Sequence, residues 1–227
     1  MRTYFFADTE TTGVRPTDKV VEIAFIQTDS DFNVLNKDQS LIDPEMAIPA
    51  GASAVHHITN KDVEFEPTIE GYMHMKNNPL LFEDAVLVAH QASFDLRYLG
   101  PWMVENVETL CTLRLAKRLY PDLDSYKLSA LRYSLDLPDF EGDAHRADAD
   151  VGMLLSLVKH MAEASGLDLE GLLELQKAPL DIKSFPFGKW KGTPLADVPP
   201  SYLSWYLGTE KPDADIAASI RKIHPNL

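Results

Sequence analysis

The sequence predicts an α/β fold in which helices flank a mixed β-sheet, the first three strands run antiparallel and a small appendage follows. Three observations support this class. Aromatic and β-branched runs joined by tight turns open the chain, short apolar runs then alternate with amphipathic segments, and the composition changes near residue 178. Strands joined by tight turns pair antiparallel, and strands separated by helices pair parallel, so one sheet is expected to hold both.

The first 42 residues contain three predicted strands. The run Thr3–Ala7 is apolar and aromatic and leads directly into Asp8-Thr9-Glu10. A second strand is predicted over 19–27 and a third over 32–42, with the acidic turn 29–31 between them. This part of the chain is therefore expected to form an antiparallel meander.

Helical patterns predominate from residue 50 onward. One short apolar run, 84–90, is predicted as a central strand. Helices are predicted over 50–56, 67–82, 91–99, 110–120, 127–135, 145–164 and 168–177. We expect one domain over 1–178 and a small appendage over 179–227, which holds a basic and aromatic segment, 183–192, and two short helices, 201–207 and 214–223.

Composition and charge limit the classes of function. The single cysteine, Cys111, excludes an internal disulfide and thiolate zinc sites, and it fits a reducing compartment. No apolar run is long enough to cross a bilayer, so we expect a cytoplasmic protein without a membrane partner. The net charge is −14, but residues 181–227 hold six lysines and arginines against five acids, a net of +1. An acidic chain can still act on nucleic acid where bound metal ions neutralise the phosphates.

Two acids share one face of the first predicted strand. Side chains alternate along a strand, so Asp8 and Glu10 point the same way. Their mutual repulsion beside an apolar strand would be relieved by a divalent cation, and hard cations such as Mg²⁺ take carboxylate ligands. The alternative is that both are strand-end acids exposed to solvent.

Three further residues extend this pair into a possible catalytic constellation. Asp95 follows the apolar strand, and His145 and Asp150 open the long helix. Four carboxylates and a histidine from the ends of core elements would suit a two-metal phosphodiester site, with the histidine taking a proton from the attacking water. Taken singly, Asp95 could be a surface acid favoured by a helix dipole, and His145 a helix-end or core histidine.

The motifs resemble those of the DnaQ-like 3′→5′ exonucleases of the DEDDh type, which use a histidine base and share an RNase H-like fold. The matching segments are Asp8–Gly13, His90–Asp95 and His145–Asp150, and Val55–Thr59 is similar to a segment near the terminal nucleotide. Segments 87–90, 111–121 and 185–192 resemble the exodeoxyribonuclease X group of that family. The resemblance implies release of 5′-mononucleotides from DNA 3′ ends, single- or double-stranded, with two Mg²⁺ or Mn²⁺ ions per site.

The same resemblance assigns roles to individual residues. Asp8, Glu10 and Asp150 would hold one ion, with Asp8 bridging to the second. Asp95 would support the site through water, and His145 would be the base. One departure is Gln91, which stands where the family usually has asparagine and whose amide lies one methylene further out.

Substrate contacts are expected at the turn after the first strand, where Thr11, Thr12 and Gly13 would lie under the terminal nucleotide. His56 could contact substrate or be polar surface, and Phe94 could stack on the terminal base or pack in the core. In segment 183–192, the lysines and aromatics could bind DNA, or the aromatics could anchor the appendage.

Two alternatives to a DNA exonuclease remain open at this point. An RNA exonuclease of the same fold would use the same five residues, and the choice depends on how the pocket treats the 2′-OH. A proofreading or DNA-repair accessory with an inert site is the rival from another class. The presence of all five chemical residues disfavours such a module, and a structural protein of this fold would have no need of four converging carboxylates.

Overall fold

The computed structural model describes residues 2–78, 80, 84–138 and 147–227. Its internal contacts divide the chain into two compact units, 1–173 and 174–227. The boundary lies within helix α8 (Leu169–Lys177), whereas the sequence predicts a division between residues 178 and 179.

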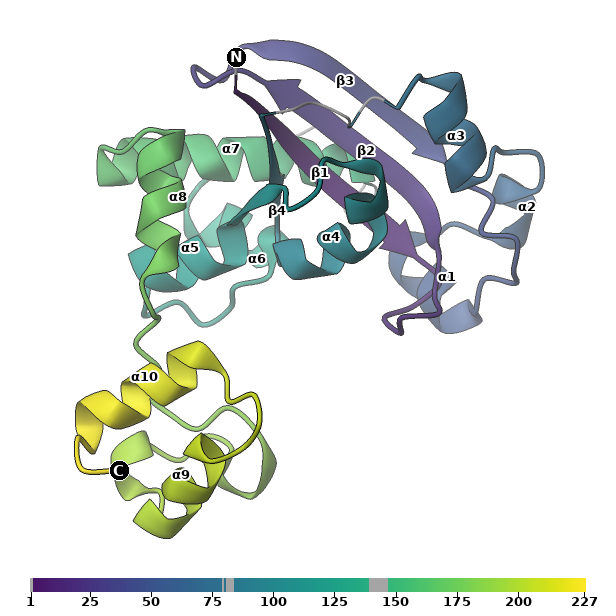
Figure 1. The fold of residues 1–227 in the computed structure, drawn as a ribbon. Helices are drawn as coiled ribbons and strands as arrows, with labels where there is room; N and C mark the ends of the chain where they lie inside the picture. The colour runs from purple at the N-terminus through teal and green to yellow at the C-terminus, as the bar shows by residue number, and fades with distance from the viewer. Residues whose placement is uncertain (1, 79, 81–83, 139–146) are drawn as a thin grey trace. The chain divides into compact units, whose positions relative to one another are not determined.

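The first unit is built on a five-stranded sheet in the order β3-β2-β1-β4-β5 (Figure 1). The strands are β1 (Thr3–Thr11), β2 (Val20–Thr28), β3 (Val34–Leu41), β4 (Ala85–Ala89) and β5 (Glu108–Cys111). The first three pair antiparallel, and β4 pairs parallel with both β1 and β5. The predicted mixed sheet with an antiparallel start is confirmed.

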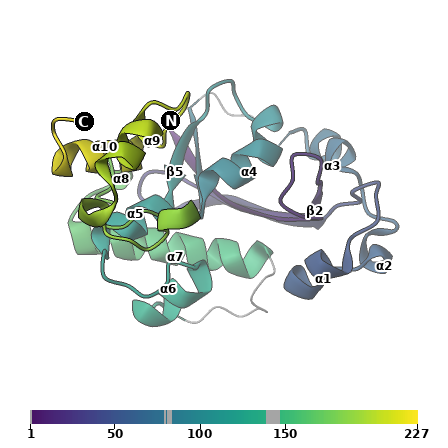
Figure 2. The ribbon, with the colours of Figure 1, turned by 90° about the horizontal axis from the view of Figure 1, so that it is seen from below.

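Helices cover both faces of this sheet. The helices described up to residue 177 are α1 (Ala50–His56), α2 (Asn60–Val63), α3 (Ile69–Met75), α4 (Ala92–Leu99), α5 (Thr112–Leu119), α6 (Leu128–Ser134), α7 (Ala147–Ser165) and α8, with a 3₁₀ turn at Gly100–Trp102. Helix α7 packs on β1 and β2, whereas α4 packs on β4, β5 and β1. Figures 1 and 2 show α4 and α7 on opposite sides of the sheet.

Two predicted elements were wrong. The helix predicted over 67–82 ends at Met75, because Asn77 and Asn78 adopt left-handed backbone angles, φ 55° and 42°, that stop a helix. The helix predicted from Leu110 begins only at Thr112, because Leu110 and Cys111 pair with β4 as the short strand β5. An apolar run of this length fits either element until its pairing partner is known.

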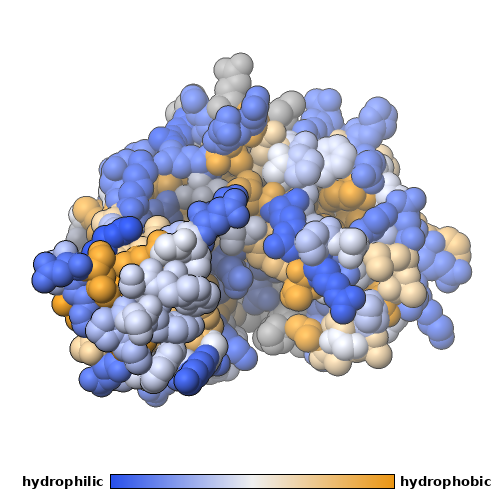
Figure 3. Space-filling model, turned by 60° about the horizontal axis from the view of Figure 1, so that its bottom comes forward, coloured by the Kyte–Doolittle hydropathy of each residue, from blue (hydrophilic) through white to orange (hydrophobic). Residues whose placement is uncertain are grey.

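The core of the first unit forms around β1. Tyr4, Phe5, Phe6 and Ala7 are each 0% exposed, since helices cover the strand on both faces. On the face shown in Figure 3, hydrophilic and pale side chains cover most of the surface and strongly apolar ones lie in small groups. Among the described residues, no helix combines the length and the apolar character needed to cross a bilayer.

The second unit has a small core of its own. Its helices α9 (Pro200–Leu207) and α10 (Ala214–Ile223) lie where helices were predicted, and two 3₁₀ turns precede them, Gly188–Trp190 and Leu195–Asp197. Phe185, 0% exposed, packs within a cluster completed by Leu195, Val198, Leu203, Tyr206, Ile216 and Ile220. Phe185 is therefore a core residue of this unit.

Replacing Phe5 by alanine should lower the free energy of unfolding by about 3–5 kcal/mol. The ring is fully buried and packs against Phe25 at a centroid distance of 5.8 Å, so its removal leaves a cavity in the core. Denaturant unfolding followed by circular dichroism measures the change. Phe65→Ala is the matched control: that ring is 92% exposed, so its loss should change stability by no more than about 0.5 kcal/mol. Equal effects of the two substitutions would contradict the assignment of the core.

Candidate active site

Three carboxylates converge between the end of β1 and the start of α7. Asp8 and Glu10 project from one face of β1, and Asp150 projects from the first turns of α7. One carboxylate oxygen from each lies within 4.8 Å of the others, and all three residues are half-buried. This is the group that the alternation along β1 and the position of Asp150 predicted.

The strand arrangement explains the place of this cluster. Because β1 and β4 are parallel, their carboxyl ends meet at the same edge of the sheet, where sites of α/β proteins commonly form. A bulge between Glu10 and Thr11 ends the regular pairing with β2 there. The acids therefore lie at the edge of the sheet, where the regular pairing of β1 with β2 ends.

Asp95 approaches β1 from the other side. It lies in the first turn of α4, is 2% exposed and accepts a hydrogen bond from the Thr9 hydroxyl at 2.9 Å. Thr9 stands between Asp8 and Glu10 in sequence, so its side chain points to the opposite face. The described group within 4.8 Å consequently holds three of the four predicted carboxylates, with Asp95 next to them across the strand.

Burial and like charges raise the pKa of Asp8 well above its usual range. Burial is the largest cause, and the neighbouring negative charges that add to it are Asp95, Asp150, Glu10 and Glu22. Burial also raises the pKa of Asp95, while the hydrogen bond from Thr9 opposes that shift. Carboxylate oxygens that repel one another in this way form a donor set suited to a hard divalent cation, which would relieve the repulsion.

Glu22 is a buried acid of this region that the sequence reading overlooked. It faces Glu10 across the β1–β2 pair and is 0% exposed. One of its oxygens accepts from the Gln39 side chain at 2.8 Å, and the other accepts from the backbone N–H of Ala147 at 3.1 Å. Glu22 thus anchors the first residue of α7, one turn before Asp150. A charged residue inside an otherwise apolar strand was the signal that could have revealed it.

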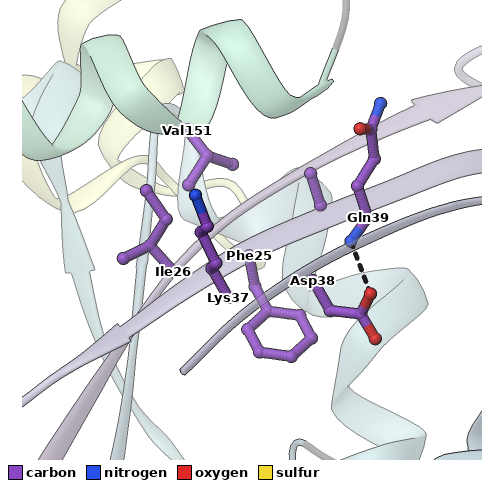
Figure 4. Close-up of a pocket in the computed structure, with 7 residues that line it drawn as sticks. Phe25, Ile26, Lys37, Asp38, Gln39 and Val151 are labelled. Atoms are coloured by element: carbon purple, nitrogen blue, oxygen red, sulfur yellow. Dashed lines mark hydrogen bonds between the residues drawn. The ribbon is translucent and has the colours of Figure 1, made fainter. Parts of the chain in front are cut away.

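A cavity of about 320 Å³ lies between β2, β3 and α7 (Figure 4). Gln39 and Val151, the neighbour of Asp150, both line it. The labelled side chains come from two strands and the helix, and Gln39 donates its backbone N–H to Asp38 at 2.9 Å.

A second cavity, of about 280 Å³, opens beside the acids. It is lined by Asp8 and Asp150 and by residues from the β4 end and from the start of α6: His90, Lys127, Leu128 and Ser129. Lys127 is exposed and brings a positive charge to the rim of this acidic cavity. The sequence reading had assigned no role to Lys127.

His90 acts as a structural clamp. Its Nε2 donates to the Tyr126 carbonyl at 2.7 Å, and its Nδ1 lies 2.9 Å from the Thr112 hydroxyl. Burial lowers the pKa of His90, and Nε2 carries a proton because the Tyr126 carbonyl that it faces can only accept. His90 therefore joins the end of β4 to α5 and to the residue before Lys127.

The turn after β1 is tied internally. Thr11 donates its hydroxyl to the Gly13 carbonyl at 2.6 Å, and the N–H of Thr12 donates to the Lys19 carbonyl at 2.8 Å. A Cβ at Gly13 would stand 2.4 Å from the Asp18 carboxylate, so a side chain there would push aside the carboxylate that accepts from the Arg15 N–H. The Thr12 amide is thus already engaged and is not available to a ligand in this conformation.

The remaining predicted site residues are not part of the carboxylate cluster. His56 is the last residue of α1; it is buried, and its Nδ1 accepts a hydrogen bond from the Ile58 N–H at 3.0 Å. Phe94 is half-buried on α4, and its ring centre lies 5.3 Å from that of Tyr98. Gln91 is exposed and left-handed, with φ 72°, where β4 passes into α4. His145 lies outside the described residues.

A mixed five-stranded sheet with carboxylates gathered at the end of its first strand defines the class of this protein, the nucleases of RNase H-like fold. The sequence model of the exonuclease family of the RNase T type matches residues 5–158, so the chain belongs to that family and is an exonuclease. Residues 170–225 match a second family model, described as a putative quorum-sensing-regulated virulence factor.

Individual relatives agree with this assignment. Exodeoxyribonuclease 10 of Escherichia coli (strain K12) is 31% identical over 207 residues, which cover 87% of each chain. The structure of exonuclease X in complex with 5′ overhanging duplex DNA is 30% identical, with a TM-score of 0.62 over 78% of this chain and 99% of its own. E. coli exonuclease I, solved with a dA16 oligonucleotide, is 19% identical with a TM-score of 0.61 over 77% of this chain and 43% of its own, which shows the fold alone.

Glu22→Ala should destabilise the protein by about 1–3 kcal/mol, because the Ala147 N–H and the Gln39 amide both lose a buried partner. Glu22→Gln should retain most of the stability, since its carbonyl can accept from Ala147 and its amide can donate to Gln39 once that side chain flips. Denaturant unfolding compares the two variants. If glutamine destabilises as much as alanine, the hydrogen-bonding role assigned to Glu22 is wrong.

In EDTA, the metal-free protein should lose stability as pH rises from about 4 to neutrality. The folded pKa of Asp8 is raised, so the folded state holds the proton to higher pH than the unfolded chain does, and ionisation at neutral pH costs stability. Asp8→Asn should therefore raise stability at pH 7.5 by at least about 1 kcal/mol and have little effect near pH 4. Thermal unfolding at both pH values measures this. Asp31→Asn, at an exposed turn, is the control, and a variant that gains nothing at pH 7.5 would contradict the electrostatic account.

Proposed function

We propose that this exonuclease releases nucleotides from the 3′ ends of DNA. The observation that carries the proposal is the convergence of Asp8, Glu10 and Asp150 within 4.8 Å beside an open cavity. Family membership supplies the reaction class. DNA as the substrate is favoured because the relative exodeoxyribonuclease 10, also called exonuclease X, is named for DNA, and exonuclease X was solved with duplex DNA.

Divalent ions, Mg²⁺ or Mn²⁺, are the cofactor that this donor set fits. In the proposal, Asp8, Glu10 and Asp150 hold one ion, Asp8 is shared with a second, and Asp95 acts through water. When bound, such ions place positive charge at the scissile phosphate and make water a better nucleophile. His145 is proposed as the base on the strength of its motif.

In this proposal, the DNA strand enters the site from the side of α6, where a lysine side chain can pair with its phosphates. Lys127 offers a cation at the rim of the cavity, and His90 fixes the backbone just before it. The acids opposite repel a strand until they are neutralised, so binding at the site and occupancy by metal are coupled. Residues 1–178 are proposed as the catalytic domain and 179–227 as its appendage.

Matched DNA and RNA strands of about 20 nucleotides, labelled at the 5′ end, test the function directly. We expect a ladder that shortens from the 3′ end, faster on DNA, that stops in EDTA and returns with Mg²⁺ or Mn²⁺. Asp150→Asn should lower the rate by about three orders of magnitude or more, because it removes a charge on which several kcal/mol of stabilisation depend. His145→Ala should lower turnover far more than substrate affinity.

Asp31→Asn is the matched control and should cut at the wild-type rate. Cleavage of DNA by Asp150→Asn at a rate comparable to wild type would refute the metal assignment. Faster digestion of the RNA strand would replace DNA by RNA as the substrate class, and an unchanged rate in His145→Ala would remove that residue as the base.

A further inference from the structure

The second unit presents a preformed loop, residues 187–192, called here the glycine loop. Backbone bonds close it at its base: Phe185 N–H donates to the Thr193 carbonyl and Gly192 N–H to the Phe185 carbonyl, both at 2.8 Å. Gly188 and Gly192 adopt positive φ, 63° and 81°, which suits glycine and defines the bend at each end. A ligand would therefore meet a loop that is already ordered.

This loop carries exposed cations next to aromatic rings. Lys189 and Lys191 are both exposed, and Lys189 Nζ lies 5.1 Å from the centre of the Trp190 ring. Phe187 is 44% exposed. The sequence from 182 to 196 contains no acid, although the whole chain carries a net charge of −14.

A row of three rings continues from the loop across α9. The Trp190 ring centre lies 6.3 Å from that of Tyr202, which lies 5.2 Å from that of Trp205. Trp205 is 61% exposed, in contrast to the buried Phe185 on which Tyr202 rests at 5.4 Å. The rings are tilted to one another by 60° (Trp190 and Tyr202) and 42° (Tyr202 and Trp205), so the exposed Trp205 ring stands beside a ring that is packed on the core.

We propose that this surface, formed by Lys189, Lys191, Trp190, Tyr202 and Trp205, binds single-stranded DNA. Lysines pair with successive phosphates while bases stack on exposed aromatic rings, and every base offers such a face, so this chemistry is tolerant of sequence. A protein partner fits less well, because lysine is depleted at the centres of protein interfaces.

A DNA-binding surface on the appendage would give the exonuclease a second contact with its substrate. This consequence rests on the proposed function. The appendage would hold a strand in the same molecule that degrades its 3′ end, which raises the effective concentration of that strand at the active site. Long strands would gain affinity from this second contact. A substrate too short to occupy both contacts at once would gain nothing.

The test measures binding of the full-length protein to a fluorescent dT20 strand in EDTA, where no cleavage occurs, by anisotropy at several salt concentrations. Removing both lysines (Lys189→Ala with Lys191→Ala) should make the slope of log affinity against log salt shallower by roughly 1.4, at about 0.7 per phosphate contact. Trp205→Ala should weaken binding roughly tenfold, and Trp205→Phe should retain most of the affinity because a ring remains.

Lys222→Ala is the matched control, since it removes one positive charge from the same unit at an ion pair with Asp181. It should leave affinity and salt slope unchanged. Wild-type affinity in both the double lysine variant and Trp205→Ala, or an equal loss in Lys222→Ala, would overturn the proposal. A protein that binds DNA through this surface but degrades no DNA with Mg²⁺ would instead refute the proposed function and leave this inference standing.

Discussion

The repulsion among the carboxylates at the end of β1 is the constraint on which the rest of the site depends. Asp8, Glu10 and Asp150 lie close together and are half-buried, and burial with the neighbouring negative charges raises the pKa of Asp8 because both disfavour its ionised form. Groups that repel can be held together only by a backbone fixed through other interactions. The fully buried run from Tyr4 to Ala7 and the parallel pairing with β4 provide that fixed backbone.

Polar contacts then position the two helices that bring acids to the strand. On one face Thr9 holds Asp95 of α4, and on the other Glu22 holds the first N–H of α7. Apolar packing alone tolerates small shifts of a helix along a sheet, whereas a hydrogen bond to a particular residue does not. The position of the helix termini, and with them the spacing of the acids, is therefore specified by a few buried polar groups.

Much of this could be predicted from the sequence because it is local. The alternation that puts Asp8 and Glu10 on one face is a property of any β-strand, and the tight turns before residue 42 indicate an antiparallel meander. Strand β5 could not be predicted, since Leu110 and Cys111 are recognisable as strand only through pairing with β4. The clamp made by His90 and the anchor made by Glu22 depend likewise on partners more than thirty residues away.

Gln91, at the junction of β4 and α4, adopts a left-handed backbone conformation that bears on folding stability. For a residue with a Cβ this conformation costs about 1–2 kcal/mol, and asparagine or glycine adopts it more readily. The side chain is exposed, so exchanging it disturbs neither the core nor the acids. Substitutions at the junction of β4 and α4 can therefore change the folding stability of the protein through the backbone conformation alone, without a change in core packing.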